Sequence, residues 1–211
     1  TFCQKLYSRE DKMKKLIVLG ASLVYMLTAV QAQEQILKPY GIKSGIIEYT
    51  YSGDKTGTGT LYFDDYGMKN AMYMETVTEG EESKGWVVSH ADYQYMWDPD
   101  QPADGMKMRN PLLTWITESS KDTLESYTEE MYTKMGMVKN GKETFLGKEC
   151  DVIKGDMGKV LVWNGIMMMM DFKMGAYTSV QKATSIKTNI PVDAKYFIIP
   201  ENITFSEMPG F

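Results

Sequence analysis

The sequence has very little of the chemistry on which most catalytic and metal sites depend. Its 211 residues include one histidine, His90, and two cysteines, Cys3 and Cys150. A catalytic triad or a histidine-based metal site needs an imidazole held by partners, whereas His90 lies in a predicted turn beside Ser89 and Asp92. The motifs G-x-S-x-G, C-x-x-C and H-E-x-x-H are absent, as is a phosphate-binding loop. We therefore expect a protein that is not an enzyme and that holds no metal or cofactor.

The chain also lacks an apolar run long enough to span a lipid bilayer. Its longest run, Leu16 to Val30, has about 15 residues, whereas a membrane-spanning helix needs about 20. This run follows Met13-Lys14-Lys15 and precedes Gln31-Ala32, an order typical of a secretory signal peptide. We therefore predict an exported protein that is cleaved near Ala32. Residues 1–32 are then upstream residues plus the signal peptide, and residues 33–211 form one domain.

The chain has fewer basic residues (23) than acidic residues (28). Loss of the leader, with five basic and two acidic residues, would take the formal net charge from −5 to −8. Proteins that bind nucleic acid present a basic patch, so we expect no nucleic-acid partner. The leader also contains Cys3, which leaves Cys150 without a partner for an internal disulfide. We expect Cys150 to be a small buried hydrophobic side chain rather than a reactive thiol.

Most of the chain has the pattern of β-strands, with β-branched and aromatic residues in short alternating runs. The dipeptides Asn140-Gly141 and Asn164-Gly165 are typical of hairpin turns. Residues 79–85 are acidic and bounded by glycine, which predicts a loop. Connections of hairpin length predict an antiparallel sheet. The predicted strands cover residues 45–51, 57–64, 68–77, 86–89, 93–97, 106–109, 148–154, 159–163, 166–174, 177–187 and 196–199.

The pattern changes to a helical period between about residues 110 and 136. Asn110-Pro111 can begin one helix, and a second is expected from about Asp122 to Met135, with Gly136 after its end. One stripe of the second helix is apolar: Leu124, Tyr127, Met131 and Met135. A single sheet cannot bury its apolar face alone, so we expect this helical insert to pack on the sheet.

Methionine is the abundant apolar residue, with 18 in the chain. Strict alternation over residues 166–174 would place Ile166, Met168, Met170, Phe172 and Met174 on one face of a strand. Methionine side chains are unbranched and adapt to irregular apolar partners, so we expect this face to hold an apolar ligand. The candidate lining residues are Leu61, Phe63, Met72, Met74, Trp115, Leu124, Tyr127, Met131, Met168, Met170 and Phe172.

Four segments of the sequence resemble the periplasmic lipoprotein-carrier (LolA-like) superfamily. They are the runs LYFDDYG at 61–67, LGKECDV at 146–152, VWNGI at 162–166 and IPVD at 190–193. The resemblance implies a mainly β (α+β) fold, with one antiparallel sheet curved as an unclosed half-barrel and a helical insert that covers its concave face. It also implies a periplasmic, non-enzymatic carrier for a lipid or an acylated protein, with transient contact to envelope membrane proteins.

Two other functions fit the same residues. Thioethers bind Cu(I), so Met167 and Met169 could belong to an envelope copper-binding protein. Alternatively, the groove is filled by its own side chains and the domain is a structural or interaction module. The aromatic residues Tyr93, Tyr95 and Trp97 could stack on a sugar, although at strand spacing we expect them to pack on the sheet surface.

Overall fold

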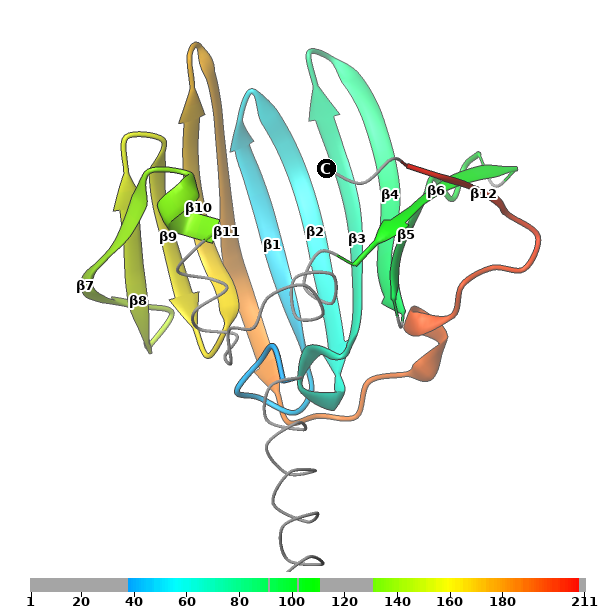
Figure 1. Cartoon of the computed structure of the whole chain (residues 1–211), viewed down its shortest axis with the longest axis horizontal. Helices are drawn as coiled ribbons and strands as arrows, with labels where there is room; N and C mark the ends of the chain where they lie inside the picture. The colour runs from blue at the N-terminus through cyan, green and yellow to red at the C-terminus, as the bar shows by residue number, and fades with distance from the viewer. Residues whose placement is uncertain (1–37, 91, 102, 111–130, 209–211) are drawn as a thin grey trace, which may run out of the picture. The chain divides into compact units, whose positions relative to one another are not determined.

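Twelve strands form one continuous sheet (Figure 1). This computed structural model of the protein describes residues 38–90, 92–101, 103–110 and 131–208. The predicted signal peptide lies outside these residues, as do Trp115, Leu124, Tyr127 and most of the predicted helical insert. Within the described ranges, no helix is both long and apolar enough to cross a bilayer.

The strands alternate along the chain with short turns. Their bounds are β1 Gly45–Gly53, β2 Lys55–Asp64, β3 Lys69–Thr78, β4 Glu81–His90, β5 Tyr93–Trp97, β6 Asp104–Arg109, β7 Met137–Phe145, β8 Lys148–Gly155, β9 Gly158–Trp163, β10 Ile166–Met174, β11 Tyr177–Thr188 and β12 Thr204–Glu207. Two short 3-10 helices, η1 Asp65–Gly67 and η2 Ala194–Phe197, lie between strands. The described end of the predicted insert is helical at residues 131–134.

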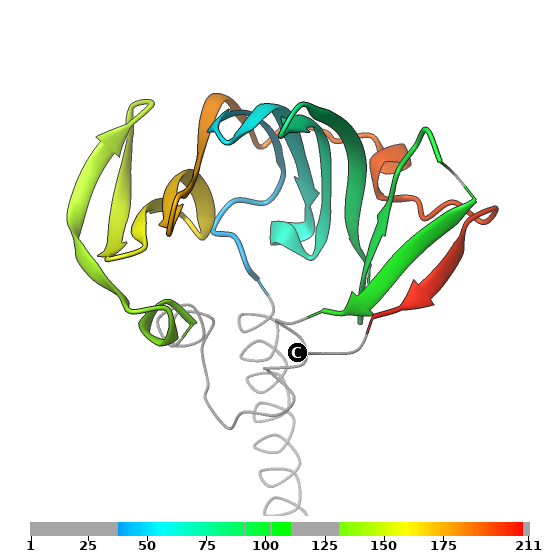
Figure 2. The same cartoon turned by 90° about the horizontal axis from the view of Figure 1, so that it is seen from above.

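The order across the sheet is β12-β6-β5-β4-β3-β2-β1-β11-β10-β9-β8-β7. The long pairing of β1 with β11 joins the two blocks of strands. Every neighbouring pair is antiparallel except β12 and β6, which are parallel, so the expectation of a purely antiparallel sheet is wrong at this edge. The sheet curves but does not close, since β7 and β12 stand at its two ends and do not pair with each other (Figure 2). The predicted mainly β half-barrel is therefore confirmed.

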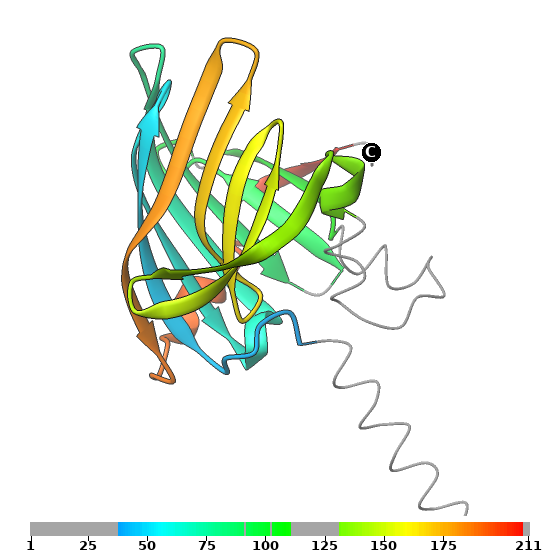
Figure 3. The same cartoon turned by 90° about the vertical axis from the view of Figure 1, so that its left-hand side faces the viewer.

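The concave face can be assigned from the segment that precedes β1. Residues 38–44 run on the concave side of the strands (Figures 2 and 3). Tyr40 from this segment packs edge-on against Phe63 of β2, with 5.1 Å between ring centroids. Phe63 and the residues that alternate with it therefore point into the concavity, and Tyr62 points to the convex side.

The largest core cluster gathers residues from both blocks of strands. It contains Ile47, Tyr49, Leu61, Phe63, Cys150, Val152, Leu161, Ile166, Met168, Met169 and Ala183. Cys150 is fully buried, which confirms its predicted role as a small hydrophobic side chain. Burial also raises the pKa of its thiol, so the reactive thiolate is disfavoured.

A ladder of aromatic rings holds the C-terminal segment on the convex face. Tyr196 of η2 stacks on Tyr62 with 3.8 Å between ring centroids, and Trp86 stacks on its cross-strand partner Trp97 at 6.2 Å. Phe205 of β12 packs edge-on against Trp97. The aromatic residues of β5 therefore pack on the sheet surface, where their ring faces are already in contact with other rings.

Three local predictions are wrong. Asn140-Gly141 is not a hairpin turn but lies inside β7, where the register with β8 shifts between Lys139 and Lys142. Gly141 has φ +76°, so the left-handed conformation that the pair favours serves a bulge here. The predicted loop at 79–85 is largely the start of β4. In the strand predicted at 196–199, residues 196 and 197 belong to η2, and residues 198 and 199 belong to no helix or strand.

Candidate functional site

A continuous apolar row crosses seven neighbouring strands on the concave face. Direct cross-strand pairing links Ile186 to Ile47, then Leu61, Met72, Val87, Met96 and finally Met106 of β6. Residues directly opposite one another point to the same face of a sheet. We call these seven residues the concave row.

Exposure increases along the concave row from the middle of the sheet toward β6. Ile47 is completely buried and Leu61 is 8% exposed. Met72, Val87 and Met96 are half-buried, and Met106 is 49% exposed. One end of the row is thus part of the core, while the other end presents methionine side chains that a ligand can contact.

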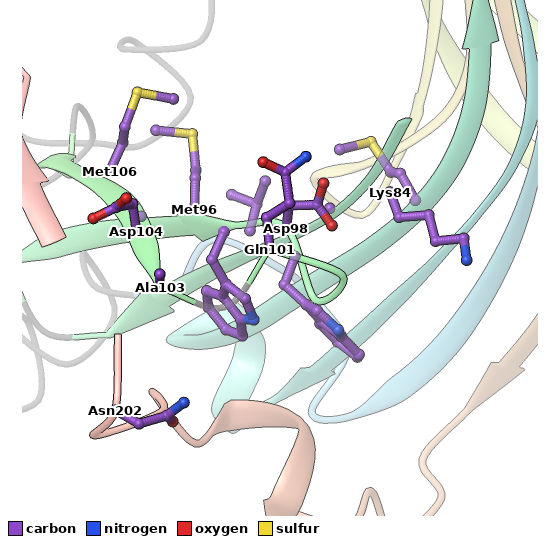
Figure 4. Close-up of a pocket in the computed structure, with 14 residues that line it drawn as sticks. Lys84, Met96, Asp98, Gln101, Ala103, Asp104, Met106 and Asn202 are labelled. Atoms are coloured by element: carbon purple, nitrogen blue, oxygen red, sulfur yellow. The ribbon is translucent and has the colours of Figure 1, made fainter. Parts of the chain in front are cut away.

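The exposed end of the concave row borders a cavity of about 800 Å³ (Figure 4). Its apolar lining residues from the concave face are Met74, Val87, Met96 and Met106, and Trp86, Trp97 and Ala103 also border it. Its size lies in the range of about 300–1,000 Å³ that is typical of small-molecule sites. The polar residues Asp98, Gln101, Asp104 and Asn202 also line this cavity.

The cationic side chain among the described residues that line the cavity, Lys84, is paired. Lys84 Nζ lies 3.0 Å from a carboxylate oxygen of Asp100, and this carboxylate raises the pKa of Lys84. Asp98 accepts a hydrogen bond from the main-chain N–H of Asp100 at 2.7 Å. Within the described ranges, no group of three His, Cys, Asp or Glu side chains is placed to hold a metal ion. The cavity therefore offers apolar contact with a few hydrogen-bonding groups at its margin.

The second apolar cluster lies on the other block of strands. Met137, Ile153 and Val160 form its centre, and Tyr132, Val162, Met167 and Met170 pack against it. Met170 is on the concave face, because it pairs with Gln181, which in turn pairs with Tyr51 of β1. A polar glutamine therefore separates this cluster from the residues of β1.

The methionine-rich strand β10 departs from the alternation that the sequence suggests. Its register with β9 shifts between Met167 and Met169. Met168 and Met169 belong to the main core cluster, whereas Met167 and Met170 pack on the second cluster. The prediction of one wholly apolar face is wrong, because the bulge shifts the side-chain alternation by one residue.

The predicted lining residues fall in several places. Leu61, Phe63 and Met168 are core residues, Met72 packs against that core, and Met74 lines the cavity. Met170 and Phe172 are half-buried on β10, and Met131 is 36% exposed. Sequence reasoning missed Val87, Met96 and Met106, although alternation within the short strands that carry them gave a usable signal.

Comparison with known proteins gives a fold but no family. No family model matches the chain, and no curated protein matches its sequence. An uncharacterized conserved protein from Thermus thermophilus aligns with a TM-score of 0.51 and 7% identity, covering 86% of this chain and 99% of that one. At this identity the likeness shows a shared fold alone.

Two more distant structures align at lower scores. The MucA/MucB complex of Pseudomonas aeruginosa aligns with a TM-score of 0.45 and 9% identity, covering 83% of this chain and 62% of that one. LprF from Mycobacterium bovis aligns with a TM-score of 0.32 and 8% identity, covering 81% of this chain and 94% of that one. Scores this low carry no argument about function.

Proposed function

We propose that the protein is a non-enzymatic periplasmic carrier or binding protein for the hydrocarbon chain of a lipid or an acylated protein. The observation that supports this most directly is the concave row. It is continuous over seven neighbouring strands, becomes accessible at Met72 to Met106, and ends at a cavity lined by further apolar side chains. A hydrocarbon chain laid along the row would meet apolar side chains from one strand to the next.

The composition of the accessible part suits such a ligand. Met72, Met96 and Met106 are unbranched thioethers, which adapt to a partner of varying shape. Removing apolar surface from water is worth about 25 cal/mol per Å², before the cost of ordering the ligand is subtracted. Binding would therefore depend on apolar area rather than on a single polar contact.

Membership of the periplasmic lipoprotein-carrier superfamily belongs to the same proposal. The unclosed half-barrel agrees with what the sequence resemblance implies, and the runs at 61–67 and 162–166 that suggested it lie at the ends of β2, β9 and β10. Export by a cleavable leader, delivery of a lipid or acylated protein, and transient contact with envelope membrane proteins follow from this proposal.

Native mass spectrometry of the protein purified gently from its own cell envelope tests the proposal. We expect a population whose mass exceeds that of the chain by one lipid, and a thermal melting temperature that falls when this lipid is extracted with organic solvent. A chain of unliganded mass only, with no stabilisation by added hexadecanoyl lysophosphatidylcholine, would contradict the proposal.

A further inference from the structure

Two glycines flank Met74 on the concave face, one on each neighbouring strand. Gly59 of β2 and Gly85 of β4 are both direct cross-strand partners of Met74. The three residues therefore lie in a line beside the concave row, with the side chain of Met74 and the open Cα positions of the glycines on the concave face. The glycines contribute no side chain to this line, so each could leave space next to Met74.

The space at the two glycines differs. A Cβ atom at Gly59 would lie 3.0 Å from both Met72 Cε and Tyr51 Oη, so existing side chains already fill that position. Among the described residues, a Cβ atom at Gly85 would meet only the carbonyl oxygen of Trp97, at 3.8 Å. Gly85 is also among the residues that line the cavity. The cavity thus extends over Gly85. We call this part of the cavity the Gly85 hollow.

The backbone does not require glycine at position 85. Gly85 is absent from the described residues with positive φ, and it lies within a regular β4 strand. Strand β5 pairs with β4 between Trp86 and His90, so within the described ranges Gly85 has no cross-strand partner on β5. Glycine weakens a strand when neither a turn nor a close backbone approach demands it. The open space is the feature that glycine preserves here.

The accessible part of the concave row is short. It runs from β3 to β6, and three strand spacings of about 4.8 Å give about 14 Å. A decanoyl chain is about as long as this stretch, whereas an extended hexadecanoyl chain is longer. The longer chain would have to leave the row, and the Gly85 hollow is the adjacent volume.

We infer that Gly85 is a specificity-determining residue, and that the hollow above it takes the part of a long unbranched hydrocarbon chain that exceeds the concave row. This inference rests on the proposed function. The Gly85 hollow would then set the preference of the site for long over short chains, while the row itself binds both.

Isothermal titration with lysophosphatidylcholines below their micelle concentrations tests the inference. The wild-type protein should bind the hexadecanoyl form more tightly than the decanoyl form. In G85L, affinity for the hexadecanoyl form should fall at least about fivefold, with the decanoyl form changed less than about twofold. T58L places the same side chain at an exposed position of β2 on the convex face and should match the wild type.

The folding of the variant can be checked separately. The melting temperature of G85L should equal or exceed that of the wild type, because leucine is a better strand residue than glycine. Should G85L fail to fold, G85A makes only an ordinary contact at 3.8 Å and should still weaken the hexadecanoyl form selectively, about twofold.

The possible failures are distinguishable. Wild-type protein that binds neither lipid would overturn the proposed function, and this inference with it. Wild-type protein that binds both lipids, with a G85L or G85A variant that binds both as the wild type does or weakens both equally, would overturn the role of Gly85 alone.

Discussion

The side-chain hydroxyl of Tyr49 donates a hydrogen bond to the main-chain carbonyl of Met167, with 2.8 Å between the two oxygen atoms. The residues are 118 positions apart, and the bond joins β1 to the methionine-rich strand β10 across the core. Tyr49 is only 3% exposed. A single buried contact thus fixes the carbonyl at the point where β10 departs from regular pairing.

Replacing Tyr49 with phenylalanine should destabilise the protein. The change leaves the Met167 carbonyl without this donor inside the core, which typically costs about 1–2 kcal/mol of unfolding free energy. Urea denaturation followed by circular dichroism would measure it. Y73F is the matched control, because the Tyr73 hydroxyl donates to Glu75 at an exposed site and its loss should change stability by less than about 0.5 kcal/mol. Equal stability of Y49F and the wild type would show that the bond contributes nothing.

The free energy of unfolding should fall at alkaline pH, because several tyrosine side chains are buried in their neutral, protonated form. Burial raises the pKa of Tyr40 and of Tyr51 from 10.0 to about 12 in each case. The folded protein then keeps these protons at a pH where the unfolded chain has lost them. Their contribution is therefore complete below pH 10 and is lost as the pH rises from 10 to about 12.

Urea midpoints measured across this range, together with tyrosinate absorbance, would check the pH dependence. The double variant Y40F/Y51F should show a smaller loss of stability over the same interval, although its stability below pH 10 also changes. Stability that stays level from pH 10 to 12, or tyrosines that all ionise near pH 10 in the folded protein, would be incompatible with the buried environments described above.

The copper alternative makes a different prediction from the carrier proposal. Met169 is 9% exposed in the main core cluster, whereas Met167 packs on the second cluster. We expect anaerobic titration with Cu(I) in the presence of a competing chelator to show no tight stoichiometric site. M167L/M169L should behave as the wild type, since leucine preserves the apolar packing. A tight site that this variant loses would favour a copper-binding protein instead.

The alternation of apolar and polar residues within each strand predicts much of the fold. Strands 93–97 and 166–174 have the predicted bounds, because each is a short run of apolar and aromatic residues between turn residues. Asn164-Gly165 is a hairpin turn as predicted, with φ of +49° and +77° at its two residues. Asn140-Gly141 has the same composition but lies in a bulge, so the choice between turn and bulge depends on the partner strand.

The site was harder to predict because it depends on register between strands. Alternation shows that Met72, Met96 and Met106 each lie on one face of their own strand, but not that they align in one row. The parallel pairing of β12 with β6 likewise joins residues far apart in the sequence, whereas the bulge in β10 lies within its local hairpin with β9. A single sequence contains no direct signal for either.

The central claim is that the accessible end of the concave row binds a hydrocarbon chain. The most direct measurement is the affinity of delipidated protein for hexadecanoyl lysophosphatidylcholine, compared between the wild type, M96S/M106S and M174S. Met96 and Met106 line the cavity, while Met174 is 62% exposed at the end of β10, away from the row. We predict that M96S/M106S binds at least about tenfold more weakly and that M174S binds as the wild type does. Unchanged binding by M96S/M106S, or the same loss in M174S, would contradict this account.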